Sequence, residues 1–289
     1  MTMNKPGQAA RGIARIIKGT PATDGAGVEL TRVIGQPPLP MLDPFLLLDA
    51  FRSDKPEDYI AGFPAHPHRG FETVTYLLSG RMRHKDNAGH EGLIEPGGIQ
   101  WMTAGKGIVH SEMPEQENGL LEGFQLWVNL PAQHKMDPPE YQEYPAGHIP
   151  VETRDNGVEV RVIAGKTAHG TQGPVVQPLT EPLYLDVTLP AGQRFAERLP
   201  AEHNAFVYVI QGSPGARDVD GKTVQLTRDD LGVLTHGESI DVQAGTNAAR
   251  FLLIAGKPLN EPVARGGPFV MNTRVEVQQA FEDYAQGRF

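Results

Sequence analysis

The sequence predicts an all-β protein built from two β-barrel units, with one short helix at the C-terminus. Three observations predict this class: short strand-like segments along the chain, an order of elements that occurs twice, and helical periodicity only near the C-terminus. The 33 glycines and 25 prolines among 289 residues are spread along the chain, which is typical of many short strands joined by turns. The content of 39% hydrophobic and 21% charged residues is ordinary for a globular protein with a buried core.

Strand-like segments are short, rich in β-branched or aromatic residues, and bounded by glycine, proline or polar residues. They include VELTRVI (28–34), FETVTYLL (71–78), GFQLWVNL (123–130), VEVRVIAG (158–165), LYLDVTL (183–189), AFVYVIQG (205–212) and ARFLLIAG (249–256). This run of strands with intervening turns predicts a sandwich or barrel.

The helix is predicted from about residue 273 to 286. Thr273 and Glu276 have the spacing of a capping box at a helix start. Apolar residues then follow at helical offsets: Val277, Ala280, Phe281 and Tyr284.

A weak internal repeat divides the chain. The strand ending at Gly80 and the strand ending at Gly212 are each followed by a hairpin-like stretch, a glycine-containing segment and a closing strand. We therefore expect two copies of one barrel, in residues 1–145 and 146–289, with the C-terminal helix in the second. The proline-, glycine- and charge-rich stretch 143–155 is the predicted junction.

Two pairs of potential metal ligands have strand spacing in the first unit. His66 and His68 alternate in FPAHPH, and His110 and Glu112 alternate in GKGIVHSEMP. Positions i and i+2 of a strand point to the same face, so two such pairs on neighbouring strands would direct four ligands to one point. Imidazole with carboxylate suits divalent iron, nickel, copper, zinc or manganese, and this ligand set leaves positions of an octahedral ion open.

The pair of His66 and His68 alone would be weak support, because a chain with ten histidines produces such pairs by chance. Surface histidines beside a turn would give the same pattern. The second pair, in a matching strand-like setting, favours the metal. The second unit has only His203 before its Gly212 strand, so we expect it to bind no ion.

Composition narrows the partners and the compartment. A formal net charge of −9 argues against direct nucleic-acid binding, which relies on Lys and Arg. The chain has no cysteine, so it has neither disulfides nor a thiol nucleophile. The N-terminal stretch lacks the apolar core of a signal peptide, and no apolar run is long enough to cross a bilayer. We therefore expect a cytoplasmic protein without membrane contact.

Long motifs resemble the pirins of the cupin superfamily. In the first unit they are HPHRGFETVTYLLSG, IQWMTAGKGIVHSEMP and GFQLWVNLP, and elsewhere they are RVIGQPPLPMLDPFLLLDAF, AQHKMDPPEYQEY and GGPFVMNTRVEVQQAFEDY. The resemblance covers most of the chain in order and is weakest over about residues 150–260. It implies a bicupin, in which two jelly-roll β-barrels stack and only the N-terminal one holds metal.

The resemblance also implies a ligand set and an ion. The family's ligands fall on His66, His68, His110 and Glu112, as strand parity predicts. The implied ion is Fe²⁺, with Mn²⁺, Ni²⁺, Cu²⁺ and Zn²⁺ as alternatives. Glu72 stands where many cupins keep a glutamate ligand, and since this role passes to Glu112 in pirins, we expect Glu72 to support the ligands or the fold.

Two functions follow from the resemblance. One is a quercetin 2,3-dioxygenase type of reaction, in which O₂ opens the ring of a flavonol such as quercetin and carbon monoxide is released, with Glu112 as metal ligand and base. The alternative is a non-catalytic, iron-binding redox sensor that regulates a transcription factor or a metabolic enzyme through protein contact. A degenerate cupin without catalysis would hold no stoichiometric metal.

The other histidines lack a partner at ligand spacing. His84 and His90 flank KDNAG, a predicted hairpin turn, and we expect both to be exposed. Surface or capping positions are expected for the rest: His134, His148, His169, His203 and His236. Trp101 and Met102 are expected in the core or in a cavity wall.

Overall fold

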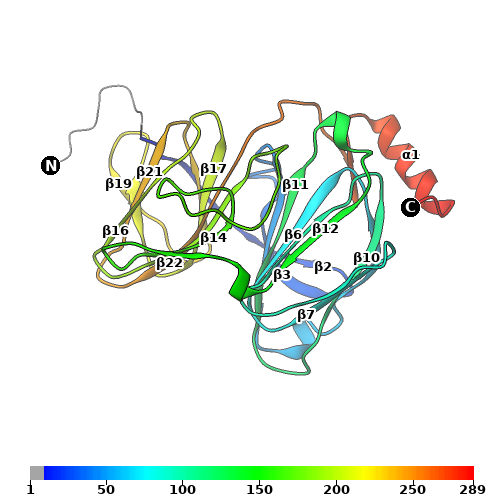
Figure 1. Ribbon diagram of the computed structural model, residues 1–289, viewed down its shortest axis with the longest axis horizontal. Helices are drawn as coiled ribbons and strands as arrows, with labels where there is room; N and C mark the ends of the chain where they lie inside the picture. The colour runs from blue at the N-terminus through cyan, green and yellow to red at the C-terminus, as the bar shows by residue number, and fades with distance from the viewer. Residues whose placement is uncertain (1–9) are drawn as a thin grey trace. The chain divides into compact units, whose positions relative to one another are not determined.

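The computed structural model describes residues 10–289. Residues 1–9, part of the N-terminal stretch that is expected to lack a signal peptide, lie outside the described residues. The described chain divides into two compact units (Figure 1). One unit, here the first barrel, comprises residues 20–148 and 259–289; the other, the second barrel, comprises residues 10–19 and 149–258. Within residues 10–289, no helix combines the length and the apolar character needed to cross a membrane.

The first barrel consists of two antiparallel sheets. The seven-stranded sheet has the order β12 (Glu140–Tyr144), β9 (Ile99–Thr103), β6 (Phe71–Ser79), β11 (Leu121–Asn129), β4 (Phe45–Ser53), β3 (Val28–Ile34) and β2 (Thr20–Asp24). The four-stranded sheet has the order β5 (Phe63–His68), β10 (Ile108–Pro114), β7 (Met82–Asp86) and β8 (Glu91–Ile94). Side chains of both sheets meet in one apolar cluster, in which Met82 and Ile94 lie with Leu77 and Leu121.

The second barrel has the same two sheets in the same order. Its seven-stranded sheet runs β1 (Ile13–Lys18), β20 (Asp230–Leu234), β17 (Asn204–Gln211), β22 (Ala249–Gly256), β15 (Leu183–Leu189), β14 (Glu159–Ala164) and β13 (Val151–Thr153). Its four-stranded sheet runs β16 (Arg194–Arg198), β21 (Ser239–Gln243), β18 (Gly215–Arg217) and β19 (Thr223–Gln225). The two-barrel, all-β class predicted from the sequence is therefore confirmed.

The two ends of the chain depart from the predicted division into residues 1–145 and 146–289. Strand β1 pairs with β20 and so completes the second barrel, at the position that β12 takes in the first. Residues 259–289 belong to the first barrel and contain β23 (Ala264–Gly266), β24 (Phe269–Met271) and the helix α1 (Arg274–Ala285). Linear order along the chain could not reveal these long-range pairings.

Helix α1 begins as its sequence predicts. Thr273 accepts a hydrogen bond from the backbone of Glu276, and the Glu276 side chain accepts from the backbone of Thr273, which completes the capping box. The apolar side of the helix packs on β24, where the ring of Phe281 lies 4.8 Å from that of Phe269. A partly buried ion pair between Arg69 and Asp283, with a separation of 2.6 Å, ties the helix to the turn after β5.

Candidate metal centre

Three histidines converge inside the first barrel. Strands β5 and β10 pair antiparallel, with His66 opposite His110. His68 lies two residues further along β5, opposite Ile108. The ring centroid of His66 lies 4.7 Å from that of His68 and 4.4 Å from that of His110. One nitrogen from each ring lies within 4.8 Å of the other two, which is a spacing that could hold a metal ion.

Two of these imidazoles leave buried nitrogen atoms without hydrogen-bond partners. His68 is 3% exposed and His110 is 1% exposed, and both His68 Nδ1 and His110 Nε2 lack a partner. An unsatisfied buried polar atom costs about 1–3 kcal/mol, and a coordinated ion would remove this cost. Burial, reinforced by the neighbouring imidazoles, lowers the pKa of His68 and of His110 well below the ordinary value. Both rings are therefore neutral, which is the form that binds metals.

Glu112 lies on the same strand as His110, beyond a register shift in the pairing with β5. It is 3% exposed. The Thr75 hydroxyl lies 2.7 Å from Glu112 Oε1 and 2.6 Å from Gln125 Oε1, and the Gln125 amide nitrogen lies 3.4 Å from Glu112 Oε2. Glu112 faces the same cavity as His66 and His68. Its carboxylate oxygens are not among the potential ligand atoms that all lie within 4.8 Å of one another.

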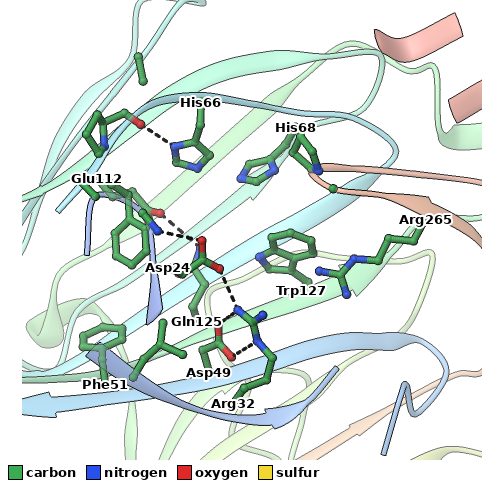
Figure 2. Close-up of a pocket in the computed structure, with 18 residues that line it drawn as sticks. Asp24, Arg32, Asp49, Phe51, His66, His68, Glu112, Gln125, Trp127 and Arg265 are labelled. Carbon is green, nitrogen blue, oxygen red and sulfur yellow. Dashed lines mark hydrogen bonds and ion pairs between the residues drawn. The ribbon is translucent and has the colours of Figure 1, made fainter. Parts of the chain in front are cut away.

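The cavity beside these residues has a volume of about 630 Å³. Its wall combines aromatic and charged side chains, and Figure 2 shows His66, His68 and Glu112 at one side and Trp127 beside the Arg265 guanidinium, which lies 4.6 Å from the Trp127 ring. Further wall residues are Phe51, Phe63, Arg32 and Asp49. This cavity provides room for a small molecule next to the three histidines.

Apart from His66, His68 and Glu112, none of these wall residues was predicted from the sequence. Gln125 and Trp127 alternate on β11, so both face the cavity while Leu126 is buried on the opposite face. The spacing of Gln125 and Trp127, two positions apart in an otherwise apolar strand, could have predicted that both side chains face a cavity. Asp49 bonds Arg32 in a bidentate pair and so raises the pKa of that guanidinium, which stays charged in the wall.

The expectation that His84 is exposed is wrong. Strand β7 extends to Asp86, so His84 is an inward position of a strand rather than part of a turn, and it is 0% exposed. Its Nδ1 lies 3.4 Å from His110 Nδ1, and its Nε2 lies 3.2 Å from Asp86 Oδ2. His90 is exposed as predicted.

The other histidines divide similarly. His148, His169 and His236 are exposed, and the half-buried His134 contacts Asp137 at 2.7 Å. His203, however, is 2% exposed, and it lines a separate cavity of the second barrel. His203 is therefore not at the surface as expected. The turn before β17 folds inward, where Arg11 donates to the carbonyl oxygen of Pro200.

Glu72, Trp101 and Met102 are all buried. Glu72 lies outside the group of three histidines, and its Oε1 accepts a hydrogen bond from Thr103 at 2.7 Å. Trp101 and Met102 occupy β9, and Met102 belongs to an apolar cluster with Ala104 and Ile108. These contacts are those of residues that support the fold.

Buried cations fix the turn that follows His68. Arg69 donates to the carbonyl oxygen of Lys106 at 2.5 Å and lies over the ring of Phe289 at 4.3 Å. The Lys135 ammonium donates to the carbonyl oxygens of Gly70 and Val270. Burial lowers the pKa of Lys135 to about 8. Residues 259–289 thus help to hold the strand that carries two of the three histidines.

Two antiparallel jelly-roll barrels, one of which encloses a histidine cluster beside a cavity, define a bicupin. Comparison with known proteins agrees: the pirin family profile matches residues 27–128, and the pirin C-terminal cupin domain matches residues 184–289. The chain belongs to the pirin family.

Several relatives resemble the chain over nearly its whole length. It is 54% identical to a pirin-like protein of Caulobacter vibrioides, over 96% of this chain and 99% of that protein. It is 52% identical, over 96% of this chain and 97% of the other, to a Pseudomonas aeruginosa protein whose name provisionally assigns it quercetin 2,3-dioxygenase activity. A crystal structure of quercetin 2,3-dioxygenase from Acinetobacter baumannii superimposes with a TM-score of 0.87 at 34% identity, covering 97% of this chain and 99% of that one.

Proposed function

We propose that the chain binds one divalent metal ion through His66, His68, His110 and Glu112, and that it catalyses oxygen-dependent ring opening of a flavonol such as quercetin with release of carbon monoxide. The observation that carries the proposal is a group of three imidazoles, two of them buried with an unpartnered nitrogen, beside a cavity that is also lined by a carboxylate. Iron(II) is the first candidate ion, and Mn²⁺, Ni²⁺, Cu²⁺ and Zn²⁺ suit the same donors. The dioxygenase names among the relatives support the reaction class.

The ion would supply Lewis-acid and redox chemistry at the 3-hydroxyl oxygen of the flavonol. Glu112 takes the hydroxyl proton, because it lies beside the three histidines and faces the cavity. The protonated carboxyl can then donate from Oε1 to the Thr75 hydroxyl, which donates in turn to Gln125 Oε1. The proton therefore has an acceptor waiting, without any side-chain movement.

The cavity walls supply apolar surface and orientation. The rings of Phe51, Phe63 and Trp127 offer flat apolar surface to an aromatic substrate. The Arg32 and Asp49 pair adds a fixed polar group at the wall. An electron-rich flavonolate held among these rings would be oriented beside the metal ligands for its reaction with O₂.

Turnover tests this proposal. Protein loaded with Fe²⁺ under argon is given quercetin and air, and flavonol absorbance and carbon monoxide are followed together. We expect carbon monoxide in proportion to quercetin consumed, with at least about a hundredfold loss of rate in Glu112→Gln if the base contributes as general bases usually do. Full metal occupancy without turnover for any of the five ions would reject the dioxygenase and favour the redox sensor.

A further inference from the structure

A buried chain of hydrogen bonds extends from His110 away from the cavity. It links the His110 ring to the His84 ring and the His84 ring to the Asp86 carboxylate, with separations of 3.4 Å and 3.2 Å. The side chains of His84 and Asp86 are both 0% exposed. Tyr141 covers this chain, with ring centroids 5.0 Å from His84 and 4.9 Å from His90.

Asp86, at one end of this series of hydrogen bonds, determines which atom donates in each of them. Asp86 Oδ1 accepts the backbone amides of Ala88 and His90 at 2.9 Å each, and Oδ2 faces the rings of His84 and His90. A carboxylate that receives so many donors is an acceptor only. His84 Nε2 therefore carries a hydrogen, and when the ring carries that hydrogen alone, His84 Nδ1 has a lone pair.

That lone pair accepts from His110 Nδ1. His110 then has its hydrogen on Nδ1, and its Nε2 presents a lone pair, which is the buried atom without a partner. We infer that Asp86 and His84 are positioning residues, which fix the tautomer and the ring orientation of His110 so that Nε2 is ready to receive a metal ion. The inference rests on the metal site of the proposed function, but not on the dioxygenase reaction.

Asp86→Asn is the sharpest test, because the hydrogen bonds to Asp86 predict the orientation of the new amide. The two backbone amides at Oδ1 keep the amide oxygen on that side, so the NH₂ group takes the place of Oδ2 and faces His84. The amide then donates to His84 Nε2, His84 donates from Nδ1 to His110, and the hydrogen of His110 moves to Nε2. Metal binding must reverse this order.

Two measurements decide the inference. Long-range ¹H–¹⁵N NMR spectra of the apo protein report the tautomer of His110, and competition with a chelating dye gives the dissociation constant for Zn²⁺. We expect the Nδ1–H form in the wild type and the Nε2–H form in Asp86→Asn. We also expect about ten- to hundredfold weaker Zn²⁺ binding in Asp86→Asn and in His84→Phe, as for other groups that orient metal ligands.

His90→Ala is the matched control, since His90 bonds the same carboxylate but is exposed and lies off the path to His110. Its dissociation constant for Zn²⁺ should stay within about twofold of the wild-type value. This change is much smaller than the one expected on removing an orienting group. An Nε2–H tautomer in the wild type, or unchanged affinity in a folded Asp86→Asn, would overturn the inference. If a variant fails to fold, the wild-type tautomer still decides. Absence of Zn²⁺ binding by the wild type would instead reject the metal site of the proposed function.

Discussion

The two barrels share one strand order but fill their interiors differently. The four-stranded sheet of the first barrel directs His66, His68, His110 and Glu112 inward from β5 and β10. The corresponding strands of the second barrel are β16 and β21. Their buried residues are Phe195, Glu197, Ile240 and Val242.

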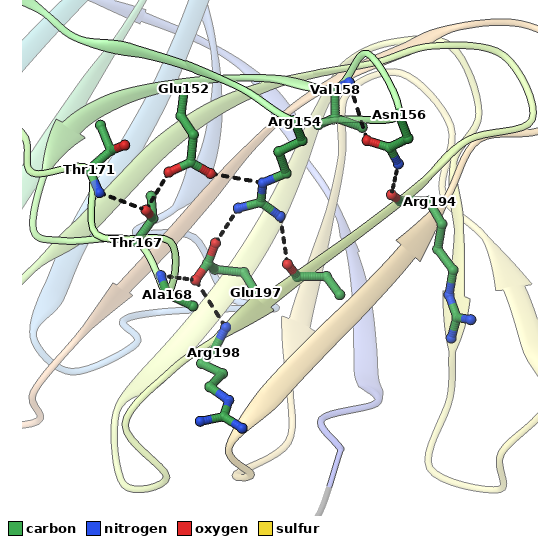
Figure 3. Close-up of polar contacts among 11 residues, drawn as sticks. Glu152, Arg154, Asn156, Val158, Thr167, Ala168, Thr171, Arg194, Glu197 and Arg198 are labelled. Carbon is green, nitrogen blue, oxygen red and sulfur yellow. Dashed lines mark hydrogen bonds and ion pairs between the residues drawn. The ribbon is translucent and has the colours of Figure 1, made fainter. Parts of the chain in front are cut away.

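Three of these four residues in the second barrel belong to one apolar cluster, where the ring of Phe195 lies 5.6 Å from that of Phe251. The fourth, Glu197, is neutralised by a protein cation: Arg154 donates to its carboxylate at 2.5 Å, and also bonds Glu152 (Figure 3). One scaffold can therefore either pair its inward-facing polar side chains within the protein, as for Glu197, or leave nitrogen atoms such as His68 Nδ1 and His110 Nε2 free to bind a ligand.

The largest expected effect lies in the second barrel. Arg154→Ala leaves the carboxylate of Glu197 buried without its cation, and we expect a loss of about 3–5 kcal/mol in the free energy of unfolding. Urea unfolding followed by circular dichroism measures it. Arg194→Ala removes an exposed arginine paired with Asp241, and we expect a loss below about 1 kcal/mol. Equal losses would contradict the role given to the buried pair.

Metal should stabilise the first barrel. A ligand that binds only the folded state at a hundred times its dissociation constant adds about 2.7 kcal/mol. We expect this gain on adding Zn²⁺ to the wild type, because the unpartnered nitrogens become coordinated, and we expect little gain in His66→Ala. Thermal unfolding with and without EDTA measures it. A gain of the same size in His66→Ala would place the ion elsewhere.

The smallest expected effect concerns the contact between α1 and the turn after β5. Hydrogen bonds from Arg69 and Arg288 hold the pKa of Asp283 below its ordinary value. A depressed carboxyl pKa contributes stability above the unfolded-state pKa, and this is lost as the pH falls through the folded value. Asp283→Asn should therefore cost about 1 kcal/mol at pH 7, and the difference from wild type should shrink as the pH falls below about 4. Urea unfolding at several pH values measures it, and a pH-independent difference would contradict the linkage.

Sequence patterns predicted what depends on local spacing. Period-two alternation brought His66 and His68 to one face, and the capping box placed the start of α1. Patterns failed where distant segments decide the environment. His84 is buried because β7 pairs with β10 and Tyr141 of β12 covers it, and nothing within the segment around KDNAG reveals this. The position of β1 in the second barrel likewise depends on pairing with β20, which lies more than 200 residues further along the chain.

Metal stoichiometry tests the central contrast between the barrels most directly. Protein purified without a histidine tag is loaded with Fe²⁺ under argon, desalted and measured by elemental analysis, together with His68→Ala and, as a buried histidine of the second barrel, His203→Ala. We predict one ion per chain in the wild type and in His203→Ala, and almost none in His68→Ala. Equal loss in both variants, or no ion in the wild type, would contradict a metal site in the first barrel.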